Sequence, residues 1–136
     1  MADLTKIRVV LENSRDVVIA RRAGREMARQ LGFGPADQTR LATAISELAR
    51  NVVQHAGEGV CLVADESNER QISIKVVIED HGPGIPDIEK AMGYGFSTGG
   101  GLGAGLPGAK RLVHEFDIES QPGHTRVAIV MNKAIV

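Results

Sequence analysis

The chain has 136 residues, a length that suits one domain (1–136) with a core of its own, and 16 basic and 17 acidic residues leave a formal charge of −1. So small a net charge gives no support for binding nucleic acid, and four aromatic residues with no Trp are too few for a base-stacking surface. The sequence has no basic-then-apolar leader and no apolar run near ~20 residues, and its one cysteine, Cys61, lies among small apolar residues. We therefore expect a cytoplasmic protein without membrane contact.

The first half of the chain predicts one strand and two helices. Residues 4–11 alternate apolar and polar side chains, which predicts a strand at a sheet edge. Asn13 or Ser14 then caps a helix that runs to about Leu31, where Gly32 stops it. A second helix follows from about Pro35 to Ala56. Its apolar stripe comprises Leu41, Ile45, Leu48, Ala49 and Val52.

The second half predicts two hairpins separated by glycine-rich chain. Strands are expected at 60–64 and 72–80, followed by a short helix at 86–92. Residues 93–101 are too rich in glycine to hold regular structure alone and resemble a lid. From about Gly103 a helix can run to His114, with free N-terminal amides that favour an anion. A closing hairpin is expected over 115–120 and 125–130.

One polar column accompanies the second helix. Glu47, Asn51 and His55 are spaced four residues apart, so they lie along one flank of the apolar stripe. A solvated helix edge would explain the same spacing. The column borders the core side, however, where desolvation makes a carboxylate and an amide more consequential.

Other site chemistries find little support in the sequence. There is no Walker A motif, no dinucleotide fingerprint after the first strand and no eukaryotic-type kinase signature. The four histidines lack the spacing and the cysteines of a zinc site. His81 and His124 fall in predicted turns, where a solvated side chain is the simpler interpretation. The same holds for Arg50 and Lys110, although each could reach a phosphate.

Three motifs in order are far more specific than any one of them. Glu47-x-x-x-Asn51-x-x-x-His55 on a helix, Asp80-x-Gly82-x-Gly84 after a strand and Gly101-x-Gly103-x-Gly105 before a helix resemble the N, G1 and G2 boxes of the GHKL ATPase superfamily. The resemblance covers nearly the whole chain. It implies a two-layer α/β sandwich of the Bergerat type, with helices on one face of a mixed, mostly antiparallel sheet.

The resemblance also implies roles for single residues. Asn51 would hold the Mg²⁺ that bridges the phosphates of ATP, and Glu47 would be the base that accepts the proton of the substrate hydroxyl. Asp80 would bind the adenine amino group, with Thr125 supporting it through water. The backbone at Gly82 and Gly84 would pass beneath the base.

The third motif would serve the phosphates. Gly101, Gly103 and Gly105 would wrap them. This assignment agrees with the chemistry, because phosphoryl transfer needs positioning and charge neutralisation more than covalent help.

Within the superfamily the chain looks most like the RsbT-type serine/threonine protein kinases, on the strings at residues 46–51, 87–92 and 97–109. That resemblance implies an ATP- and Mg²⁺-dependent stressosome switch kinase. Its substrates would be STAS-domain proteins, which would also act as its scaffold, and its downstream target a PP2C-like phosphatase.

Two alternatives stay open. An anti-sigma factor kinase of the RsbW or SpoIIAB type would share the ATP site but sequester a sigma factor. A nucleotide-gated binding module would use the same site with little catalysis.

Overall fold

The computed structural model describes residues 6–85, 92 and 105–135 of the chain. In chain order the elements are β1 (Lys6–Leu11), α1 (Ser14–Gln30), α2 (Pro35–His55), β2 (Gly59–Asp65), β3 (Gln71–Asp80), α4 (Gly105–Leu112), β4 (Glu115–Gln121) and β5 (His124–Ala134). The helix predicted at 86–92, apart from Met92, and the lid predicted at 93–101 lie outside the described residues.

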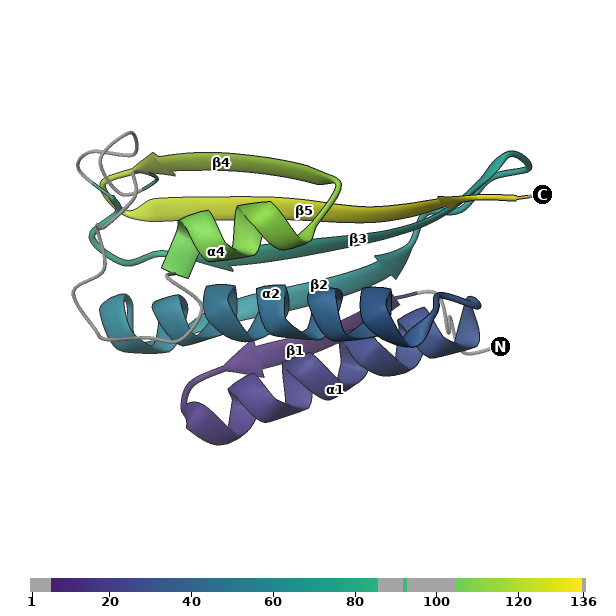
Figure 1. Ribbon diagram of the computed structural model, residues 1–136. Coiled ribbons are helices and arrows are strands. Elements are labelled where there is room, and N and C mark those ends of the chain that lie inside the picture. Colours follow the sequence, from purple (N-terminus) through teal and green to yellow (C-terminus); the bar gives the residue numbers. More distant parts are fainter. Residues whose placement is uncertain (1–5, 86–91, 93–104, 136) are drawn as a thin grey trace.

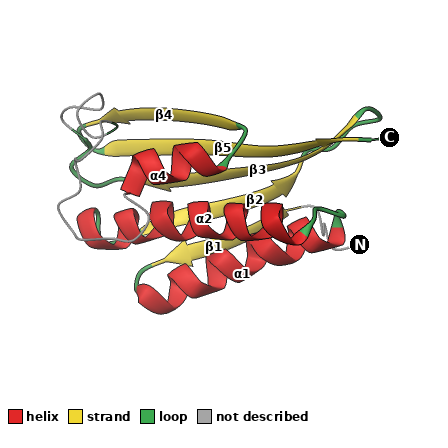
Figure 2. Cartoon of the chain, viewed as in Figure 1, coloured by secondary structure: helices red, strands yellow, loops and turns green. Residues whose placement is uncertain are grey.

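The described strands form one sheet in the order β1-β2-β3-β5-β4, with every neighbouring pair antiparallel. The described helices lie on one side of this sheet (Figure 1). The predicted α/β sandwich is therefore confirmed, and the first strand lies at the sheet edge as expected. Figure 2 shows the two layers, helices in red over strands in yellow. No helix among the described residues is both long and apolar enough to span a bilayer.

The helices α1 and α2 begin where their sequences predict. The Asn13 side chain accepts hydrogen bonds from the amides of Arg15 and Asp16, and the Asn13 amide donates one to the Asp16 carboxylate. Gly32 has φ +88°, so it ends α1 in the left-handed region that glycine favours. Pro35 opens α2, whose predicted apolar stripe is buried against the sheet and α1. That packing orients the polar flank of α2.

Several boundaries within the described residues are displaced by a single residue, and two differ from the prediction by more. The helix expected to reach His114 ends at Leu112, because the His114 amide donates to the Val130 carbonyl and the chain has already joined the sheet. The last strand was expected to end at Val130 but continues to Ala134, because it pairs with β3 over that strand's full length, to Gln71.

Candidate functional site

Glu47 is the most deeply buried member of the polar column on α2. The residue is 6% exposed, whereas Asn51 is half-buried and His55 is exposed, so the column runs from the core to solvent. The apolar stripe explains this gradient in exposure. Its side chains pack in the core, so the middle of α2 is covered by the sheet and by α4. A buried carboxylate at this place needs hydrogen-bond donors.

Two donors reach Glu47 from different directions. Its Oε2 accepts from the backbone amide of Gly105, the first residue of α4, at 3.2 Å. Its Oε1 accepts from a guanidinium nitrogen of Arg50 at 3.0 Å. Arg50 is exposed, as the sequence interpretation of a solvated charge expects, and it also pairs with the candidate base. The contact with Gly105 brings the first and third predicted motifs together; Gly101 and Gly103 lie outside the described residues.

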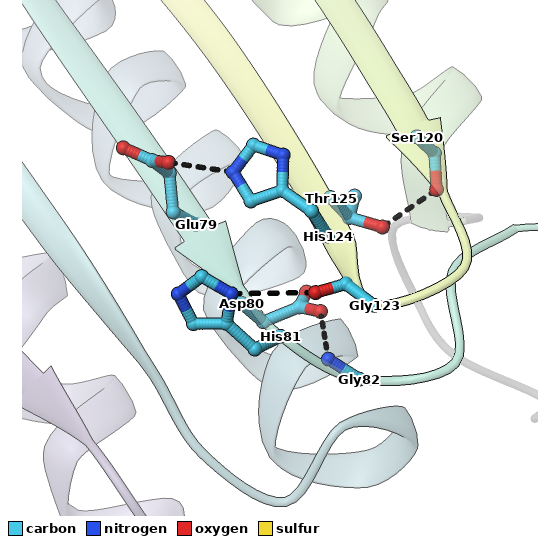
Figure 3. Close-up of polar contacts among 8 residues, drawn as sticks. All are labelled: Glu79, Asp80, His81, Gly82, Ser120, Gly123, His124 and Thr125. Carbon is cyan, nitrogen blue, oxygen red and sulfur yellow. Dashed lines mark hydrogen bonds and ion pairs between the residues drawn. The ribbon is translucent and has the colours of Figure 1, made fainter.

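Asp80 is the last residue of β3 and is 8% exposed. Its Oδ1 accepts a hydrogen bond from the Gly82 amide at 3.0 Å (Figure 3). Within the described part of the chain its other oxygen, Oδ2, has no donor. A buried carboxylate with one oxygen held by the backbone and one available can accept a hydrogen bond from an amino group such as that of adenine. Asp80 therefore offers a hydrogen-bond acceptor that fits the predicted adenine nucleotide.

Thr125 lies beside Asp80 because the two residues are paired between β3 and β5. It is 7% exposed, and its hydroxyl lies 2.6 Å from the hydroxyl of Ser120 on β4. Ser120 Oγ also accepts from the Ile85 amide at 2.8 Å, which ties the loop after β3 to the last hairpin. Sequence reasoning missed Ser120. The hairpin register, which pairs Ser120 with Thr125, would have revealed it.

Gly82 and Gly84 are required by the packing of the loop itself. A Cβ at Gly82 would lie 2.6 Å from the Cβ of Ala56 at the end of α2. Gly84 has φ +84°, and a Cβ there would lie 2.5 Å from the Gln121 carbonyl oxygen. Close approach to protein backbone thus explains both glycines, and their predicted approach to a base stays a prediction.

The two histidines near Asp80 differ in their surroundings. His124 begins β5, is half-buried, and its Nε2 lies 2.8 Å from Oε2 of Glu79. The expectation that His124 is a solvated turn residue is therefore wrong. His81 is exposed, and its Nδ1 lies 3.3 Å from the Gly123 carbonyl oxygen. The centroids of the two imidazole rings lie 5.5 Å apart (Figure 3).

Asn51 is the predicted magnesium ligand. Among the described residues its amide makes no hydrogen bond, so its oxygen is available to a cation. No cluster of three His, Cys, Asp or Glu side chains suited to a metal occurs in the described residues. Magnesium needs no such cluster, because it keeps several waters and takes one or two protein oxygens together with phosphates. A single amide oxygen therefore fits this ion.

The family model of histidine kinase-, DNA gyrase B-, and HSP90-like ATPases matches residues 36–135. The chain is 50% identical over 123 residues to the serine/threonine-protein kinase RsbT of Bacillus subtilis, covering 90% of this chain and 91% of that protein. It is 31% identical over 119 residues to an anti-sigma F factor of Caldanaerobacter subterraneus, covering 83% and 82%.

Solved structures share the fold. The RsbU and RsbW domains of Rv1364c from Mycobacterium tuberculosis match with a TM-score of 0.67 and 19% identity, over 94% of this chain and 33% of that one. The nucleotide-free catalytic domain of histidine kinase ThkA matches with a TM-score of 0.53 and 17% identity, over 92% and 95%.

Proposed function

Because the chain belongs to the histidine kinase-, DNA gyrase B- and HSP90-like ATPase family, we propose that it is an ATP-dependent serine/threonine protein kinase of the RsbT kind. Its place is a cytoplasmic partner switch in bacterial stress signalling. Its substrates are small STAS-domain regulators, and a PP2C-like phosphatase is its downstream target. The 50% identity to RsbT over most of both chains supports this proposal over the anti-sigma alternative, whose relative is 31% identical.

One observation carries the catalytic assignment. Glu47 is a buried carboxylate in an ATPase fold, and it is hydrogen-bonded to the first amide of α4. A carboxylate there can accept the proton of a substrate hydroxyl, and the positive N-terminal end of α4, where the Gly105 amide already binds Glu47, favours the charge of a phosphate. The Arg50 guanidinium on Glu47 Oε1 keeps the carboxylate oriented.

The other residues position the nucleotide. Asp80 would accept a hydrogen bond from the adenine amino group, with Thr125 beside it. Asn51 would give its amide oxygen to Mg²⁺, which supplies charge neutralisation at the phosphates when bound. Positioning of this kind can account for several kcal/mol of barrier lowering, on the order of 7–11 in well-oriented systems.

The test is transfer of labelled γ-phosphate from ATP to a STAS-domain protein of the same organism. Wild type is compared with Glu47→Gln, which keeps an oxygen to accept from the Gly105 amide but removes the base. We expect transfer to fall by about 10²–10⁴-fold while ATP binding changes little. Glu58→Gln, on an exposed side chain beyond α2, is the matched control and should transfer at the wild-type rate.

Each alternative function predicts a different result in these measurements. If neither wild type nor Glu47→Gln transfers phosphate although both bind ATP, the nucleotide-gated binding module is the better description. If the wild type holds a sigma factor more tightly than the STAS-domain protein, the anti-sigma function replaces the one proposed.

A further inference from the structure

The sheet has one face that no described helix covers. Along β1 and β2, Val9, Leu11, Cys61 and Val63 are buried under the helices, so the residues between them point to the other side. On that side Val10 is 43% exposed and Leu62 is 39% exposed. Figure 1 shows the described helices on the opposite side of the strands. Large apolar side chains on an open sheet face indicate a contact surface.

The register of the strands places apolar residues on this face in a diagonal strip from β1 to β5. Pairing partners connect them step by step across the sheet. The strip consists of Val10, Val60, Leu62, Val77, Ala128 and Val130, of which Val10 and Leu62 are exposed, Ala128 is buried and the other three are half-buried. The strip crosses three inter-strand spacings and advances four residues along the strands, so its diagonal length is about 20 Å. An α-helix of about 13 residues has the same length.

Charges of opposite sign flank the strip. The side toward the start of β1 is basic and carries Lys6, Arg8 and Lys75. The side toward β4 is mainly acidic and carries Glu79, Glu115, Asp117 and Glu119, with Arg126 between two of them. An amphipathic helix with one acidic and one basic flank would therefore match this face in both shape and charge.

A second copy of the chain matches the face less well. A two-fold axis along β3 would place Lys75 against Lys75 and Glu79 against Glu79 at the centre, although it would pair Arg8 with Asp117 at the rim. An axis across the strands would oppose Arg8 to Arg8 and Asp117 to Asp117. Like charges are most costly at the desolvated centre, and rim pairs contribute little.

A substrate is also a poor occupant. Glu47 and the start of α4 lie on the helix side of the sheet, and the strip lies on the other side. A hydroxyl presented on the open face could not reach the base. The face suits a partner that is bound and regulated without being phosphorylated.

We propose that the open sheet face, along the strip from Val10 to Val130, binds an amphipathic helix of the downstream PP2C-like phosphatase. This rests on the proposed function, because it takes the phosphatase from there. The phosphatase and the STAS-domain substrate then occupy opposite sides of the sheet, so binding one does not sterically exclude the other.

The experiment compares Leu62→Asp with Ile19→Asp, the same change at a 47% exposed apolar residue on α1. Both sites are exposed, so circular dichroism should show folded protein. Two quantities are measured with the full chains: phosphate transfer to the STAS-domain protein, and affinity for the phosphatase by calorimetry. We expect Leu62→Asp to weaken phosphatase binding by about tenfold or more and leave transfer unchanged. Ile19→Asp should change neither.

A photo-crosslinking residue at position 62 tests the helix directly. Crosslinks in the phosphatase should fall at helical spacing, three or four residues apart, whereas alternate-residue spacing would contradict a helix. The proposal is overturned if wild type does not bind the phosphatase, if Leu62→Asp binds it normally, or if sedimentation shows a wild-type dimer that Leu62→Asp dissociates. Absence of phosphate transfer by wild type would instead overturn the kinase function. Phosphatase binding is measured separately, so the two failures can be told apart.

Discussion

Replacing Gly82 by alanine tests how the loop after β3 is held against α2. The new Cβ would lie 2.6 Å from Ala56 Cβ and 2.9 Å from Ala56 Cα, distances at which one segment has to move. Overpacking of this kind costs about 1–3 kcal/mol of unfolding free energy. The movement would also strain the hydrogen bond from the Gly82 amide to Asp80, so we expect affinity for ATP to fall as well.

A second variant, Ala56→Gly, makes the reasoning quantitative. It removes the Cβ that Gly82→Ala would strike. On its own it costs at most about 0.5–1 kcal/mol, the range for glycine in a helix interior, because Ala56 is the C-cap of α2. If the two changes were independent, the double variant would lose about 1–4 kcal/mol. Because the collision between the two Cβ atoms is absent, we expect it to be at least about 1 kcal/mol more stable than that sum.

The assay is urea denaturation of wild type, both single variants and the double variant, with ATP binding measured in parallel. Similar m-values would show that the four proteins unfold in the same way. The remaining 2.9 Å contact with Ala56 Cα limits the recovery, so the double variant should stay below wild type. Free energies that add within about 0.5 kcal/mol would refute the argument, since the two residues would then not touch.

Three further predictions concern the core and the site. Burial raises the pKa of the Cys61 thiol to about 12, so the folded protein should resist Ellman's reagent at pH 8. Because the unfolded thiol ionises from about pH 9, the free energy of unfolding should fall between there and pH 12 by more in wild type than in Cys61→Ala. Gly24→Ala would overlap Ile45 Cδ1, so its melting temperature should drop, and adding Ile45→Val, which removes that carbon, should restore part of the loss. Ser120→Ala removes the acceptor of the Ile85 amide, so hydrogen exchange at Ile85 should accelerate relative to wild type, and unchanged exchange would contradict the bond.

Local patterns predicted the elements well because each depends on residues close in sequence. Asn13 caps α1 through amides two and three residues away, and Pro35 needs only its own ring to open α2. The boundaries that were wrong, at His114 and beyond Val130, depend on pairing with a strand elsewhere in the chain. No local signal specifies such a partner.

The residues of the candidate site likewise divide into those that the sequence indicated and those that only tertiary contacts bring together. Motif spacing singled out Glu47 and Asp80, and the family resemblance added Thr125; the structure places all three in buried positions. It did not indicate the hydroxyl pair of Ser120 and Thr125 or the contact of His124 with Glu79. The second pair joins residues 45 apart, which meet because β5 lies next to β3 in the sheet.

The sequence by itself determined the helix and strand periods, the motif order and hence the family, because these are properties of neighbouring residues and of matching strings. The tertiary structure alone decided which polar groups contact one another. The Glu47 carboxylate accepts a hydrogen bond from the Gly105 amide, 58 residues away, only after α4 packs on α2. The strip on the open sheet face exists only once the register is set, because a one-residue slip would turn each of its side chains toward the helices.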